Sequence, residues 1–117
     1  MSTLKVNAIQ GTDGVERYTA RAWVNFNGTG TVAIRAAGNV SSITDRGTGS
    51  YRVNLTTAMP DTNYAVAVSA GIPLSNLSYA SFAGDAPTTS TFDLQTVNTN
   101  AMTTLADPSY VSAVVYR

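Results

Sequence analysis

The sequence predicts an all-β protein, a small antiparallel β-sandwich of about seven to nine strands that follows an extended amino-terminal arm. Apolar and polar residues alternate over short runs, which is the period of a half-buried strand. Gly, Asn, Asp and Pro separate these runs about every eight to twelve residues, as turns do in sandwiches. No window of more than about ten residues keeps a helical period.

The first part of the chain is expected to be an arm over residues 1–20, separate from a sandwich domain over residues 21–117. Residues 3–9 alternate modestly and predict a short strand, and the glycines of residues 11–14 predict a flexible turn after it. This strand either lies at the edge of the sandwich's own sheet, or pairs with a neighbouring subunit or the next component of a particle. The apolar side chains proposed for such assembly are Leu4, Val6 and Ile9.

The strands of the sandwich follow in order. Residues 21–27 and 31–36 form a hairpin across Gly28-Thr29-Gly30, because glycine accepts the positive φ that tight turns require. Residues 50–57 have the cleanest alternation, after a turn over residues 45–49. The predicted strands that remain are those at 40–44, 64–70, 79–82, 89–97 and 110–116.

Two segments lack a clear pattern, namely residues 71–87 and a predicted long loop at 98–108. Binding surfaces tend to vary in loops carried on a rigid sheet. Tyr79 and Phe82 are therefore candidates for surface contact, the alternative being a small core beneath the loop. Trp23 is a third candidate, because it alternates onto the face opposite the core. There it either packs in a subunit interface or under a loop, or provides a platform for stacking a sugar.

Charge and composition argue against several classes of function. Seven basic and seven acidic residues make up 12% of the 117-residue chain, about half of the usual ~25%. The basic residues are scattered singly, which disfavours nucleic-acid binding. No apolar run approaches the ~20 residues of a membrane span, so no membrane insertion is expected. The start of the chain, MSTLKVNAIQ, lacks the basic and apolar regions of a secretion signal.

The sequence contains no recognisable catalytic or metal site. His and Cys are absent, which excludes the usual triads, thiol nucleophiles, zinc sites and disulfides. Asp45 and Asp61 lie beside Gly or Pro positions, where Asp usually bonds to turn amides. Asp85 and Asp107 are the best-placed acids for calcium, but neither has the spaced carboxylates of a calcium loop. We therefore expect a protein that is not an enzyme, with no cofactor and no metal.

The stretch from Ala22 to Asn63 resembles a known family. It contains, in order, AWVNF, GTGTVAIR, NVSSITD, GTG and TTAMPD, and in this it resembles the carboxy-terminal domain of tailed-bacteriophage tail-fibre proteins, including those of phages that infect cyanobacteria. A weaker similarity covers Ser2 to Gln10, which looks like the amino-terminal tag of cyanophage tail proteins. The resemblance implies a β-sandwich that assembles as a homotrimer near the distal end of a fibre and contacts host surface polysaccharide. It supplies no catalytic residue.

One departure from the family bears on function. A fibre of this kind has a long shaft before the domain, whereas here Ala22 follows directly on the arm. The favoured expectation is a short trimeric tail fibre, fixed to the phage tail or baseplate by the arm. The alternative is a capsid decoration or cement protein, whose first strand adds to a capsid sheet by β-augmentation. Either role places the protein in the virion, with itself and other phage proteins as partners. A depolymerase is disfavoured.

Overall fold

The computed structural model describes residues 3–71, 78–98 and 104–117. Over these residues the chain forms strands joined by turns and bends, with no helix, so the predicted all-β class is confirmed. It follows that this part of the chain holds no helix of the length and hydropathy needed to cross a membrane.

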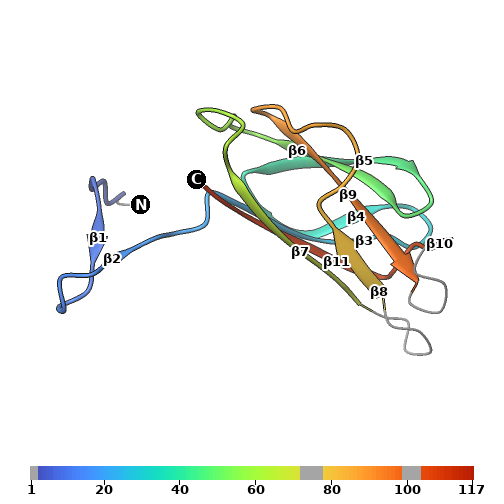
Figure 1. The fold of residues 1–117 in the computed structure, drawn as a ribbon, viewed down its shortest axis with the longest axis horizontal. Helices are drawn as coiled ribbons and strands as arrows, with labels where there is room; N and C mark the ends of the chain where they lie inside the picture. Colours follow the sequence, from blue (N-terminus) through green and yellow to red (C-terminus); the bar gives the residue numbers. More distant parts are fainter. Residues whose placement is uncertain (1–2, 72–77, 99–103) are drawn as a thin grey trace.

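Two antiparallel sheets make up the body of the molecule (Figure 1). The first is four-stranded, in the order β4 (Ala33–Gly38), β3 (Ala22–Asn27), β11 (Tyr110–Tyr116) and β7 (Ala65–Gly71). The second is five-stranded: it runs β10 (Thr104–Leu105), β9 (Thr91–Asn98), β6 (Ser50–Leu55) and β5 (Val40–Gly47), and β8 (Ser78–Ser81) also pairs with β9. The last strand, β11, thus returns to lie between β3 and β7.

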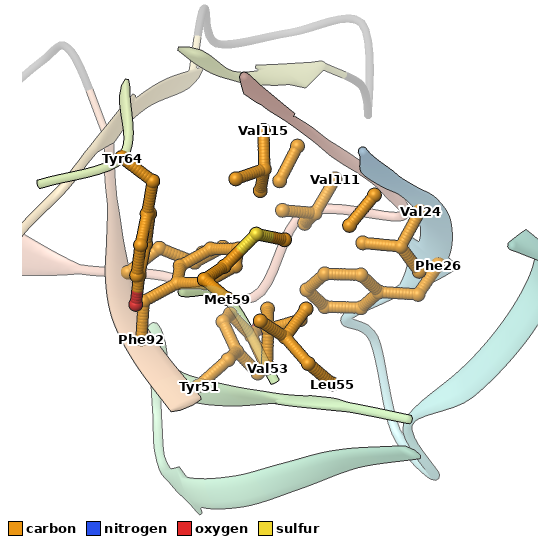
Figure 2. Packing of buried hydrophobic residues seen from close by; sticks show 13 residues of the cluster. Val24, Phe26, Tyr51, Val53, Leu55, Met59, Tyr64, Phe92, Val111 and Val115 are labelled. Carbon is orange, nitrogen blue, oxygen red and sulfur yellow. The ribbon is translucent and has the colours of Figure 1, made fainter. Parts of the chain in front are cut away.

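The core lies between the two sheets (Figure 2). Successive residues of a strand point to opposite faces, so each strand contributes one alternating set of side chains. The four-stranded sheet contributes Ala22, Val24, Phe26, Val111, Ala113 and Val115, and the other sheet contributes Tyr51, Val53, Leu55, Phe92 and Leu94. The rings of Phe26 and Tyr51 meet edge to face across the interior, with centroids 5.2 Å apart and planes at 71°. Two antiparallel sheets around one shared core are consistent with a β-sandwich.

Most predicted strands are present, with shifted ends. Those that the structure contains are the predicted strands at 21–27, 40–44, 50–57, 64–70, 79–82, 89–97 and 110–116. The strand predicted at 31–36 begins later and continues to Gly38. Within the β3–β4 pair the register shifts at a bulge between Asn25 and Phe26, and the strand ends before Asn39, whose φ is 56°.

Two predictions about connecting segments were wrong. The segment 45–49 is not all turn, because β5 continues to Gly47 and leaves Thr48 and Gly49 as the turn. The segment 98–108 is not all loop, because β10 pairs with β9. Ala106 follows β10 and holds this stretch beside β9: its amide donates to the Thr96 carbonyl at 3.1 Å, and its carbonyl accepts from Thr96 Oγ1 at 2.6 Å.

Residues 3–20, the amino-terminal segment, form a hairpin of their own. β1 (Ile9–Gln10) pairs with β2 (Glu16–Arg17) in a separate two-stranded sheet, and residues 3–8 form no strand. Figure 1 shows this hairpin to one side of the two large sheets. The predicted strand over residues 3–9 is therefore wrong for most of its length. The edge-strand interpretation is also wrong, because β1 pairs with β2 and belongs to neither large sheet.

Candidate interaction surface

The outer surface of the four-stranded sheet has almost no charge. Residues paired across antiparallel strands point to the same face, so those that alternate with the core positions are the outer ones. We call this surface the Trp23 face, and its members are Trp23, Asn25, Ala36, Ala65, Ala67, Ser69, Ser112, Val114 and Tyr116. None of these side chains carries a formal charge at neutral pH. One charged side chain reaches the same surface: Arg35 donates to Asn25 Oδ1 at 3.3 Å, and its guanidinium lies 4.0 Å from the ring centroid of Tyr110.

Trp23 is the largest side chain on this face. Its neighbours across the sheet are Gly38 on β4 and Val114 on β11. Because Gly38 has no side chain, the indole lies over its backbone, where an added Cβ atom would collide with the ring. Trp23 is nevertheless 43% exposed. It therefore lies opposite the core, as the alternation predicts, and is available for contact.

The outer surface of the five-stranded sheet is polar and bonded to itself. Asn54 on β6 donates its side-chain amide to Ser42 Oγ at 3.1 Å and to Thr44 Oγ1 at 2.9 Å, both on β5. These cross-strand bonds satisfy the amide within the sheet. The two outer surfaces of the molecule thus differ in chemistry.

An ion cluster of Arg46, Arg52, Asp85 and Asp93 covers part of this polar surface. The Asp93 side chain is only 3% exposed, although it sits on the outer side of β9. It accepts hydrogen bonds from Arg52 Nε at 2.6 Å, from Arg46 Nη1, and from the Asp85 backbone amide at 3.0 Å. The bond from Arg52 lowers the pKa of Asp93 despite the opposing effect of burial, so this carboxylate stays ionised at neutral pH.

A groove of about 500 Å³ lies between the amino-terminal segment and the four-stranded sheet. Val6, Ile9 and Tyr18 of the segment line it together with Ala65 and Tyr116 of the Trp23 face. The charged residues in its lining are Glu16, Arg17, Arg21 and Arg117. Because residues of both line the groove, the amino-terminal segment and the Trp23 face border each other there.

The predicted assembly residues lie together in the amino-terminal segment. Leu4 is 84% exposed, and Val6 and Ile9 are also exposed although they line the groove. A segment that leaves all three in solvent makes little use of them within its own chain.

The predicted surface-contact residues do not form one site. Phe82 follows β8 of the five-stranded sheet, whereas Trp23 is on the outer face of the other sheet. Phe82 is partly exposed, and its ring packs edge-on against Phe92, with centroids 6.1 Å apart. It therefore covers the core from the side. The backbone of Tyr79 is in β8, but its side chain lies outside the described residues.

The acids considered for turns or calcium have partners within the protein. Asp45 and Asp61 each accept a bond from the amide two residues on, at 3.0 and 2.8 Å, as turn residues do. Asp107 accepts from the Tyr51 hydroxyl at 2.8 Å, and burial together with this carboxylate raises the pKa of Tyr51. Asp85 belongs to the ion cluster. In the ranges that the structure describes, no three His, Cys, Asp or Glu side chains are grouped so that they could hold a metal.

Asp61 also forms an ion pair that the sequence did not predict. Arg117 donates Nε to Asp61 Oδ1 at 2.8 Å and Nη2 to Oδ2 at 2.6 Å. This contact, with the bond from the Asn63 amide, lowers the pKa of Asp61 from 3.8 to about 2.

A pH titration of stability tests this pair. A carboxylate whose pKa is lower in the folded state stabilises the protein above its unfolded pKa, and the effect is lost as the pH falls through the folded value. We expect Asp61→Asn to be less stable than wild type at pH 7, and the difference to shrink as the pH is lowered from about 4 towards 2. Urea unfolding of both proteins at several pH values measures this. A difference that is the same at all pH values would contradict it.

Two features of these surfaces were not among the predicted site residues. Val114 and Tyr116 belong to the Trp23 face, and their alternation with the core positions of β11 was a sufficient signal. The ion cluster left a weaker signal in the sequence, namely the acidic residue Asp93 between the apolar Phe92 and Leu94 of a predicted strand. Its arginine partners lie 41 and 47 residues away in the sequence, so only the strand order brings them together.

Comparison with known protein families, with curated proteins and with solved structures finds no match to this chain.

Proposed function

We propose that the chain is a virion structural protein, a short trimeric tail fibre. In this role its amino-terminal arm attaches it to the phage tail or baseplate, and its sandwich contacts the host cell surface. The observation that carries the proposal is a pair of surfaces that expose large apolar side chains to solvent, one on residues 3–20 and the other the Trp23 face. Exposed apolar surfaces of this kind mark sites of association, and a small domain gains stability by covering them.

The resemblance of Ala22 to Asn63 to tail-fibre domains supports the same proposal. So does the polar outer surface of the second sheet, which presents Ser42, Thr44 and Asn54 on a sheet that the ion cluster braces. Hydroxyl and amide groups on a rigid sheet suit contact with neutral polysaccharide. A fibre tip of this kind acts by presenting a fixed shape, without turning over a substrate.

One observation favours the alternative function, a capsid decoration or cement protein. Residues 3–8 form no strand, although Leu4 and Val6 alternate with polar neighbours. An extended stretch of this kind can add to the edge of a sheet in another protein, with backbone hydrogen bonds giving affinity and alternate side chains giving specificity. A capsid sheet would be such a partner.

Fractionation of phage particles that carry the chain tests the proposal. Heads and tails are separated and each fraction is examined by mass spectrometry. We expect the chain in the tail fraction. Its recovery with heads instead would favour the decoration protein, and its absence from both fractions would contradict both functions.

A further inference from the structure

The amino-terminal segment carries apolar side chains that its own chain leaves in solvent. Leu4, Val15 and Tyr18 are each more than half exposed. The segment's only regular structure is the two-stranded hairpin of β1 and β2, and a hairpin alone is marginally stable at best in water. The segment therefore needs another surface on which to pack.

The Trp23 face has the matching properties. Trp23, Val114 and Tyr116 offer apolar area, and the small side chains of Ala65 and Ala67 let another chain approach closely. The charge at its β4 side is that of Arg35, which already donates to Asn25 and to the Ser109 carbonyl and stacks on Tyr110, so most of the face can be covered without desolvating an ion cluster. Covering the opposite sheet instead would desolvate the ion cluster, which is costly.

We propose that the amino-terminal segment of one copy packs on the Trp23 face of the next copy around the trimer. This inference rests on the proposed trimeric fibre, and it identifies which surface forms the seam. Leu4 and Val6 are then buried between copies against Trp23 and Val114. Each copy gives one segment and receives one, which is a head-to-tail contact that closes into a ring.

The point at which the segment leaves the sheet favours a neighbouring copy over its own chain. The Arg21 amide donates to the Val115 carbonyl at 2.8 Å, which fixes the chain at the edge of the Trp23 face. From there the segment runs away from the sandwich (Figure 1), so it would have to reverse direction to cover its own face. Residues 9–17 fold back as the β1–β2 hairpin, which projects to one side of the two large sheets (Figure 1), and residues 3–8 before it add up to about 20 Å of reach when extended. The segment is long enough to reach a neighbour.

Single-cysteine variants test this inference cleanly, because the natural chain has no cysteine. Val6→Cys and Ala67→Cys proteins are refolded together and treated with a short bismaleimide cross-linker. Each chain then has one thiol, so a linked product always joins two copies. We expect a product of twice the 12.2 kDa chain mass, well above the amount formed by either variant alone. The matched control pairs Val6→Cys with Ser42→Cys on the polar surface, and little product is expected from it.

Light scattering at micromolar concentration measures the mass of the wild-type protein. This mass distinguishes an error in the assigned seam from an error in the proposed trimer. A trimer that gives no Val6–Ala67 product, or that gives as much product with Ser42, would overturn the assigned seam while leaving the proposed trimer intact. A protein that scatters as a 12.2 kDa monomer would overturn the trimer itself.

Discussion

Replacing Gly49 by alanine is expected to lower the free energy of unfolding by about 2 to 5 kcal/mol. Gly49 is buried in the β5–β6 turn with a φ of 65°, a left-handed conformation that L side chains rarely adopt. An added Cβ atom would lie 2.5 Å from the Thr96 carbonyl oxygen and 2.8 Å from the Ala106 amide nitrogen. Both atoms belong to the hydrogen-bonded backbone, so relieving the collision requires breaking the Thr96–Gly49 or the Ala106–Thr96 bond.

Gly30 provides a matched control for this substitution. It has the same φ of 65°, but an added Cβ atom would meet nothing within 4 Å. Gly30→Ala is therefore expected to cost only the conformational part, about 1 to 2 kcal/mol. Urea unfolding followed by circular dichroism measures both variants. Equal losses for the two would show that the close approach to β9 contributes nothing.

Replacing Asp93 by alanine is expected to cost about 2 to 4 kcal/mol at neutral pH. The substitution removes a nearly buried carboxylate and leaves Arg46 and Arg52 without their shared partner. The expected loss is below that for a fully buried ion pair, because the two arginine side chains are 36% and 30% exposed. Chemical denaturation of the variant and wild type at pH 7 checks this.

Asp85 supplies the control within the same ion cluster. Its side chain is 66% exposed and contacts the same two arginines. Asp85→Ala is therefore expected to cost less than about 1 kcal/mol, as exposed ion pairs do. A second check uses pH. The pKa of Asp93 is lowered in the folded protein, so its contribution is present above about pH 4 and is lost as the pH falls below that value. The gap between wild type and Asp93→Ala should close in the same range, and a gap that persists in acid would contradict the ionic explanation.

The strands could be predicted because the signal for them is local. In β6, Tyr51, Val53 and Leu55 alternate with polar residues, and this is enough to place them in the core. The same rule placed Trp23 on the outer face of β3. It failed for residues 3–8, where the alternation is present but no strand of the described chain pairs with these residues.

Features that depend on distant parts of the chain could not be predicted in this way. The burial of Asp93 requires β5, β6 and β9 to lie side by side, because its arginine partners come from the first two strands. The tight packing around Gly49 requires β10 to return beside β9. Neither contact leaves a pattern in the residues nearby, since each depends on the order of the strands.

The first and last strands of the sandwich are neighbours, with Ala22 paired to Val115, so the chain enters and leaves the sandwich at one pole. The opposite pole is formed by the turn after β3 and the stretch before β11, where the Gly28 amide donates to the Pro108 carbonyl at 3.0 Å. A reporter fused to the carboxy terminus would therefore sit beside the base of the domain, where the amino-terminal segment joins it (Figure 1). A peptide inserted at Gly30, which has open space around it, would be displayed at the far pole.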